Sequence, residues 1–267
     1  MQKITSRDNQ KLKFARKIRD RSENDFLFVE GVRLAEEFLK SGLQIFDCFF
    51  SPDFLTNERN QNLFDRISAK TNDLFEIPER IFNSISDTKN SQGLILIGEK
   101  PQTGKDKINL QTFEFQKFPF AVFFHEINNP NNLGAILRTC EAVSISNVII
   151  SKNSTDVFSP KALRSAMGAS FRLNFWDDAE FEDVLVWAKE NNLISVCADI
   201  NSEKNLWEID WKKPRLIIFG SEARGLSETE REKIDEGLII PMKKSVESLN
   251  LAVSCAVVLY EAKRNWI

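Results

Sequence analysis

Short apolar runs alternate with helical periodicity in the first part of the chain. Four runs there are short and apolar enough to be strands: 26–29, 45–50, 74–77 and 94–97. Three segments between them have apolar residues at three- and four-residue spacing, which predicts helices: 32–40, 57–71 and 78–86. This alternation predicts a small α/β domain with a sheet flanked by helices.

The second half repeats the alternation on a larger scale. Its predicted strands are 120–124, 147–151, 193–198, 216–220 and 237–240, and its longer predicted helices are 159–169 and 180–191. Ser227 and Glu230 have the spacing of a capping box, so a short helix is expected from Ser227 through Glu236. Residues 99–118 have little apolar periodicity and contain Pro101 and Gly104. We therefore predict domains at 1–98 and 119–267, joined by a linker at 99–118.

The last helix begins after a strand that stops at Pro241. From Ser248 onward, apolar residues recur at helical spacing and predict one buried face: Leu249, Ala252, Val253, Ala256, Val257 and Tyr260. Ser248 and Asn250 stand at the start of this helix, where free backbone N–H groups can bind a polar or anionic ligand. An ordinary helix cap is an equally good interpretation of these two residues.

Two further loops follow apolar strands. Residues 221–226 follow one predicted strand, and residues 128–132 follow another and lead into a helix that carries Arg138. Binding residues collect at the carboxyl ends of strands in open α/β sheets. The three loops, rich in Asn, Ser, Gly, Glu and Arg, therefore predict one shared pocket.

These stretches carry a family resemblance. NNPNNLGAILRT at 128–139, IIFGSEARGLS at 217–227 and IIPMKKSVESLNLAVSCAVVLYE at 239–261 resemble, in order and spacing, the three signature motifs of the SpoU (TrmH) family of RNA ribose 2′-O-methyltransferases. The resemblance implies an α/β parallel-sheet methyltransferase domain with a C-terminal trefoil knot. It also implies that S-adenosyl-L-methionine binds in the knot and that the chain forms a homodimer.

The resemblance also assigns the site residues. Gly220, Ile240 and Leu249 are expected to line the cofactor site, with Gly225 and Met242 nearby. The catalytic residues implied are Asn132, Arg138, Glu222, Ser248 and Asn250. An arginine is a poor free base because its pKa lies above about 12. We therefore expect Arg138 to hold the phosphate and the nucleophilic oxygen, while an ion pair with Glu141 on the helix surface is the alternative.

The stretches ITSRDNQKLKFARKIRDR at 4–21 and FLFVEGVRLAEEFLKSG at 26–42 resemble, more loosely, the N-terminal substrate-binding domain of SpoU enzymes, which implies a smaller α/β RNA-binding domain. Residues 1–21 contain eight Lys or Arg and two Asp, a net charge of +6. Because the whole chain has a net charge of −3, the remaining residues carry −9. Such a basic end can dock RNA. A solvated helix that buries Leu12, Ala15 and Ile18 is the alternative. Glu30 and Gly31 lie within the second of these stretches, but a purely structural role for them, as a strand-to-helix turn, fits equally well.

Composition limits the remaining choices. The four cysteines have no paired spacing, so neither a metal site nor a disulfide framework is indicated, and reduced thiols in a cytoplasm fit best. No apolar run approaches the length of a membrane span. The single histidine, His125, is interpreted as structural or peripheral. The predicted substrate is 23S ribosomal RNA, with tRNA as the alternative substrate. One alternative function is a catalytically silent RNA-binding or ribosome-assembly role. Another is a dinucleotide oxidoreductase, but this sequence lacks the G-x-G-x-x-G turn expected of that class.

Overall fold

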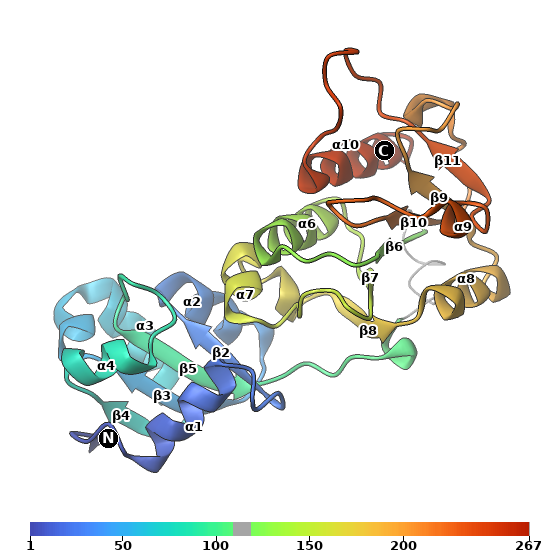
Figure 1. The fold of residues 1–267 in the computed structure, drawn as a ribbon. Helices are drawn as coiled ribbons and strands as arrows, with labels where there is room; N and C mark the ends of the chain where they lie inside the picture. Colours follow the sequence, from blue (N-terminus) through green and yellow to red (C-terminus); the bar gives the residue numbers. More distant parts are fainter. Residues whose placement is uncertain (109–118, 267) are drawn as a thin grey trace. The chain divides into compact units, whose positions relative to one another are not determined.

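A computed structural model describes residues 1–108 and 119–266 (Figure 1). By their contacts these residues divide into two compact units. One contains Met1–Pro101 and Val157–Phe171, and the other contains Gln102–Asp156 and Arg172–Ile267. Half of the predicted linker, residues 109–118, lies outside the described residues, so the linker and the domain boundaries stay predictions.

The first unit contains a mixed sheet in the order β1-β4-β3-β5-β2, in which β5 is antiparallel to β3 and β2. Its strands are β1 (Gln2–Lys3), β2 (Phe26–Glu30), β3 (Ile45–Phe50), β4 (Leu74–Glu76) and β5 (Leu94–Glu99). Its helices are α1 (Gln10–Arg19), α2 (Val32–Ser41), α3 (Glu58–Ser68), α4 (Glu79–Ile85) and α7 (Pro160–Ala166), with short 3-10 turns at Pro52–Thr56 and Ala169–Phe171. The four strands and three helices predicted in this region are confirmed within a few residues.

Helix α1 buries Leu12, Ala15 and Ile18, the stripe expected of a solvated amphipathic helix. Some of its cations are engaged within the protein: Lys11 Nζ lies 2.6 Å from Asp47, and Arg19 Nε lies 2.7 Å from Asp20. The structural interpretation of α1 therefore holds, and RNA contact by its remaining cations stays a prediction.

Glu30 has a structural role in the first unit. Its buried carboxylate accepts hydrogen bonds from the Thr88 hydroxyl at 2.7 Å, from the Asp87 backbone N–H at 2.8 Å, and from the Ser86 hydroxyl. Arg164 on α7 lies 3.9 Å from the same carboxylate and 2.6 Å from that of Asp87. These bonds explain why α7, although it follows β7 in the chain, groups with the first unit.

The second unit is built on a parallel sheet in the order β11-β9-β10-β6-β7-β8. Its strands are β6 (Phe120–Phe124), β7 (Asn147–Ser151), β8 (Asn174–Ala179), β9 (Ile194–Ala198), β10 (Arg215–Phe219) and β11 (Glu236–Leu238). Its helices are α6 (Pro130–Ala142), α8 (Phe181–Glu190), α9 (Glu228–Arg231) and α10 (Leu251–Arg264), with 3-10 turns at Lys105–Lys107 and Leu206–Glu208. The expected α/β class with a parallel sheet is confirmed. The trefoil knot stays a prediction.

Central strands β6 and β10 are buried along their whole length, as expected of parallel strands covered on both faces. Ala121 and Phe123 of β6 pack with Val184 and Trp187 of α8 in one core cluster. Helices α6 and α10 pack against each other (Figure 1). Cys140 and Cys255 meet between them, and burial, together with the hydrogen bond between the thiols, raises the pKa of Cys255. The Cys255 thiol therefore stays neutral, and both cysteines are buried packing groups.

Two predicted helices differ from those observed, and one observed strand was not predicted. Strand β8 was missed, because Asp177 and Asp178 interrupt its apolar pattern. The helix predicted at 159–169 ends at Ala166, where Met167 takes a left-handed conformation with φ of 52°. The capping box at Ser227 is confirmed, but its helix ends at Arg231, because Glu236 already belongs to β11.

The predicted buried face of the last helix was wrong. Helix α10 starts at Leu251 rather than Ser248 and buries Cys255, Val258, Leu259 and Ala262. The predicted face is instead solvent-facing at Val253, Val257 and Tyr260. The helix is apolar on both sides, so apolar spacing alone could not determine which side packs on α6.

Within the described residues, no helix is long and apolar enough to cross a membrane. All four cysteines are buried and carry free thiols.

Candidate active site

The site begins where two neighbouring parallel strands end. Phe124 of β6 and Phe219 of β10 are register partners, so the loops that follow them start side by side at the same sheet edge. The His125 backbone N–H donates to the Phe219 carbonyl at 2.9 Å and extends the pairing by one residue. This placement brings together two of the three loops that the sequence assigned to a common pocket.

The loop after β10 folds back on itself. Ser221 and Gly225 exchange two backbone hydrogen bonds of 3.0 and 3.2 Å, and Gly225 has a φ of 65°. A Cβ on Gly220 would lie 2.4 Å from the carbonyl carbon of Gly225. Gly220 is therefore required by the loop's own backbone.

Glu222 connects this loop to the start of α6. Its carboxylate accepts from the backbone N–H groups of Asn128 at 3.1 Å and Asn129 at 3.2 Å, and from Asn132 Nδ2 at 3.4 Å. A carboxylate in this place also complements the positive end of the α6 dipole. Glu222 thus holds the loop that precedes α6 and orients the Asn132 amide.

Asn250 brings in the third loop. It is the N-cap of α10, and its Oδ1 accepts from the Ala252 backbone N–H at 2.9 Å. Its Nδ2 donates to Asn132 Oδ1 at 3.2 Å. Glu222, Asn132 and Asn250 therefore form one hydrogen-bonded series across all three loops, and the helix-cap role of Asn250 coexists with this contact.

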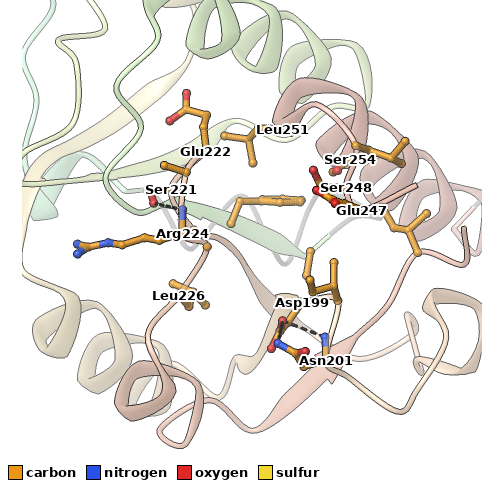
Figure 2. Close-up of a pocket in the computed structure, with 18 of the residues that line it drawn as sticks. Asp199, Asn201, Ser221, Glu222, Arg224, Leu226, Glu247, Ser248, Leu251 and Ser254 are labelled. Atoms are coloured by element: carbon orange, nitrogen blue, oxygen red, sulfur yellow. Dashed lines mark hydrogen bonds between the residues drawn. The ribbon is translucent and has the colours of Figure 1, made fainter. Parts of the chain in front are cut away.

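A cavity of about 390 Å³ lies beside this series, a size typical of sites for small ligands (Figure 2). All five expected cofactor residues line it, as do Glu222 and Ser248 of the expected catalytic set. The lining residues are Ala198, Asp199, Ile200, Asn201, Phe219, Gly220, Ser221, Glu222, Ala223, Arg224, Gly225, Leu226, Arg231, Leu238, Ile240, Met242, Glu247, Ser248, Leu249, Leu251 and Ser254.

The lining of the cavity fits S-adenosyl-L-methionine. Apolar side chains such as Leu238, Ile240 and Leu249 can pack on the faces of an adenine ring, and the carboxylate of Glu247 can accept from an ammonium group. The exposed backbone of the loop after Gly220 adds hydrogen-bonding groups.

Arg138 lies further along α6 than the expected catalytic residue Asn132. It is six positions after Asn132 on α6, about 9 Å along the helix axis, and its side chain is exposed. Within the described parts of the chain it makes no hydrogen bond or ion pair. The alternative pairing with Glu141 is not formed, because that carboxylate binds Arg172 instead.

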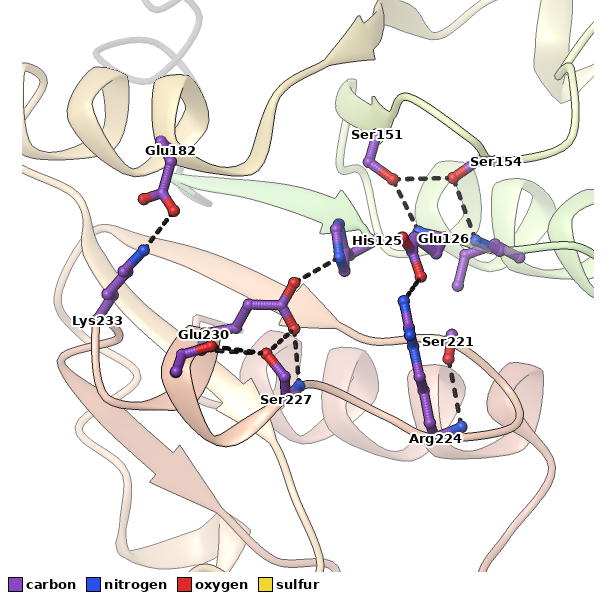
Figure 3. Close-up of polar contacts among 12 residues, drawn as sticks. His125, Glu126, Ser151, Ser154, Glu182, Ser221, Arg224, Ser227, Glu230 and Lys233 are labelled. Atoms are coloured by element: carbon purple, nitrogen blue, oxygen red, sulfur yellow. Dashed lines mark hydrogen bonds and ion pairs between the residues drawn. The ribbon is translucent and has the colours of Figure 1, made fainter.

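Two polar side-chain pairs close to the site were not found from the sequence. Arg224, on the loop after β10, donates to the carboxylate of Glu126, which follows β6 (Figure 3). His125 Nε2 lies 2.9 Å from Glu230, and the imidazole packs on Phe123 and Phe181. The buried position of His125 therefore agrees with the structural role expected from the sequence. No local spacing signals either pair, since the partners are far apart in the sequence.

The pKa of Glu230 lies below its usual range. Burial of this carboxylate acts to raise its pKa, but hydrogen bonds from Ser227 and interaction with the His125 ring outweigh burial. The Ser227 N–H and hydroxyl each lie 2.7 Å from the same Glu230 oxygen.

Among the residues with described positions, no group of three or more His, Cys, Asp or Glu side chains could hold a metal ion.

The fold and the site together define a class of protein. They form a parallel α/β domain in which loops at one sheet edge surround a cavity suited to a nucleotide-like cofactor. Comparison with protein families gives the particular family. The SpoU rRNA Methylase family model matches residues 119–260, and the MRM3-like substrate binding domain matches residues 9–96. The chain therefore belongs to the SpoU rRNA methylase family of S-adenosyl-L-methionine-dependent RNA methyltransferases, as its three motifs predicted.

Individual relatives agree with this assignment. The chain is 29% identical to an uncharacterized tRNA/rRNA methyltransferase of Synechocystis sp., over 98% of this chain and 93% of the relative. It is 24% identical to the 23S rRNA (guanosine(2553)-2'-O)-methyltransferase RlmP of Bacillus subtilis, over 98% of this chain and 100% of the relative. The crystal structure of an AdoMet-bound rRNA methyltransferase from Sinorhizobium meliloti superposes with a TM-score of 0.85 at 25% identity, covering 99% of this chain and 98% of that one.

Proposed function

We propose that the protein methylates a ribose 2′-hydroxyl of 23S ribosomal RNA with S-adenosyl-L-methionine as methyl donor. The observation that carries the proposal is the hydrogen-bonded series Glu222–Asn132–Asn250 beside the cavity. When bound, the cofactor supplies an electrophilic methyl group on a sulfonium. The protein's main task is then to hold the attacking 2′-oxygen in line with that group.

The chain's own residues divide this task. The Ser248 hydroxyl and the amides of Asn132 and Asn250 can hydrogen-bond the ribose hydroxyl and the adjoining phosphate. Glu222 holds the Asn132 amide in place. Arg138 positions the phosphate through its guanidinium, and a neighbouring RNA phosphate accepts the proton of the 2′-hydroxyl.

Two findings favour ribosomal RNA. The first unit matches a substrate-binding domain of the MRM3-like type, and a relative that matches almost the whole chain is named as a 23S rRNA methyltransferase. Transfer RNA is the alternative substrate, because another relative is named for both RNA types.

The proposed enzyme is a homodimer that pairs through α10. The exposed fractions of Val253, Val257 and Tyr260 are 48%, 38% and 55%, and these residues share one side of the helix. An apolar helix side exposed in this way is typical of a surface that a second chain covers.

The test is transfer of labelled methyl from S-adenosyl-L-methionine to undermethylated total RNA, resolved by RNA size and followed by mapping of ribose methylation. Label at one 2′-oxygen of the large-subunit RNA is expected. Label in transfer RNA would keep the reaction and overturn the substrate. Cofactor binding without any label would favour a silent RNA-binding role.

A further inference from the structure

Arg224 reaches from the loop after β10 to the loop after β6. Its guanidinium donates to the Glu126 carboxylate, which is its one side-chain partner among the described residues (Figure 3). The Arg224 side chain is 69% exposed, whereas that of Glu126 is 23% exposed. A solvent-facing cation is thus held against a more buried anion beside the active site.

The carboxylate is the fixed member of the pair. Glu126 has a φ of 55°, a backbone conformation that is uncommon for a residue with a side chain. Such a conformation persists only where the surrounding structure holds it in place. Its backbone N–H donates to the Ser151 hydroxyl at 2.7 Å, and the next N–H, of Ile127, donates to the Ser154 hydroxyl at 3.1 Å. These bonds fix the backbone from which the Glu126 side chain extends.

The backbone of Arg224 is also held, and its side chain is largely exposed to solvent. The Arg224 N–H donates to the Ser221 hydroxyl at 3.3 Å within the folded-back loop. Figure 2 shows the guanidinium extending away from the other labelled side chains of the cavity. Its charge therefore faces outward, where a polyanion can reach it.

The energetics favour an exchange of partners. Because the cation of this pair is exposed, water screens its attraction to Glu126, and the ion pair contributes only a modest free energy. A guanidinium binds phosphate through two parallel hydrogen bonds, which are charge-assisted and stronger. Little is therefore lost when Arg224 leaves Glu126 for a phosphate.

We propose that Arg224 binds an RNA phosphate at the mouth of the active site, and that Glu126 holds the guanidinium in position and competes with the phosphate for it. This inference rests on the proposed function, since it requires an RNA substrate. It adds a binding residue outside the expected catalytic set and a carboxylate that weakens RNA binding.

The test is filter binding of an unmodified 23S ribosomal RNA transcript over a series of salt concentrations. Arg224→Gln is expected to weaken binding roughly tenfold and to reduce the slope of log affinity against log salt by about 0.7–0.9. Glu126→Gln is expected to tighten binding about two- to fivefold, because the competing charge is removed. Arg224→Lys keeps the cation and should keep the slope.

Lys233→Gln is the matched control. Lys233 forms a comparable exposed ion pair with Glu182 in the same unit, drawn apart from the Arg224 pair in Figure 3. Its loss is expected to change neither affinity nor slope. An equal change of slope in Lys233→Gln would show a general charge effect and overturn the inference.

The two substitutions of the pair separate phosphate binding from a structural brace. If the pair only braces two loops, Arg224→Gln and Glu126→Gln weaken RNA binding together and leave the slope unchanged, which overturns the inference. If the wild type methylates RNA but both variants change RNA affinity in the same direction, this inference is overturned and the proposed function stands. If the two variants change RNA affinity in opposite directions but the wild type transfers no methyl group, the phosphate contact is supported and the proposed function is overturned. A wild-type protein that binds no RNA would overturn both.

Discussion

Asn132 and Asn250 are 118 positions apart in the chain, yet Asn250 Nδ2 donates to Asn132 Oδ1 at 3.2 Å. The first is in the first turn of α6 and the second caps α10, so the packing of these two helices brings the amides together. Because Asn132 also donates to Glu222, a change at any member of the series is expected to disturb the others.

The two roles of Asn250 can be separated by substitution. Asn250→Ala removes the helix cap and the amide, so we expect a loss of about 1 kcal/mol in unfolding free energy together with reduced methyl transfer. Asn250→Ser keeps a capping oxygen and loses only the amide donor to Asn132. It should retain stability and still lower kcat about tenfold, or ~1.4 kcal/mol. Urea unfolding and methyl-transfer kinetics measure the two effects; full activity in the serine variant would show that the amide contact is dispensable.

Arg138 is expected to affect activity without affecting stability. Because its side chain is exposed and unpaired among the described residues, Arg138→Ala should change the unfolding free energy by less than about 0.5 kcal/mol. Methyl transfer should fall by about 100-fold, or ~2.7 kcal/mol, if Arg138 positions the phosphate. Arg172→Ala, which breaks the surface pair with Glu141, is the control and should keep its activity. Undiminished transfer by Arg138→Ala would remove Arg138 from the mechanism.

Acid is expected to destabilise the second unit partly through Glu230. The pKa of this carboxylate is lower in the folded protein than in the unfolded chain, where it is about 4.3. Its stabilising contribution is therefore complete above that value and is lost as the pH falls through the folded-state pKa. Urea unfolding over a pH series should show wild type more stable than Glu230→Gln at neutral pH, with the difference shrinking on acidification. A difference that stays constant would mean that the charge of Glu230 does not contribute.

The exposed side of α10 gives a prediction about oligomeric state. Val257→Glu should convert the proposed dimer to a monomer, because it places a charge in an apolar interface. Val186→Glu, on the exposed side of α8, is the control and should leave the sedimentation unchanged. A wild-type protein that sediments at the 30.7 kDa of one chain at micromolar concentration would contradict the dimer.

Local patterns were sufficient where one element supplied its own signal. The apolar runs at β6 and β10 predicted buried strands, and Ser227 with Glu230 predicted a helix start. The pattern failed at β8, whose aspartates hide its strand character, and at α10, where two sides are apolar. In both cases the neighbours in the fold determine the outcome, and periodicity carries no information about them.

The sequence by itself determined the fold class, the family and the residues expected at the site, because turn chemistry, apolar spacing and the three motifs are local properties of the chain. Only the tertiary structure decided which of these residues meet. It placed Glu222 on the backbone of the loop before α6, joined Asn132 to Asn250, left Arg138 exposed, and paired Arg224 with Glu126. Those contacts depend on sheet order and helix packing, which place residues about a hundred positions apart within hydrogen-bonding distance.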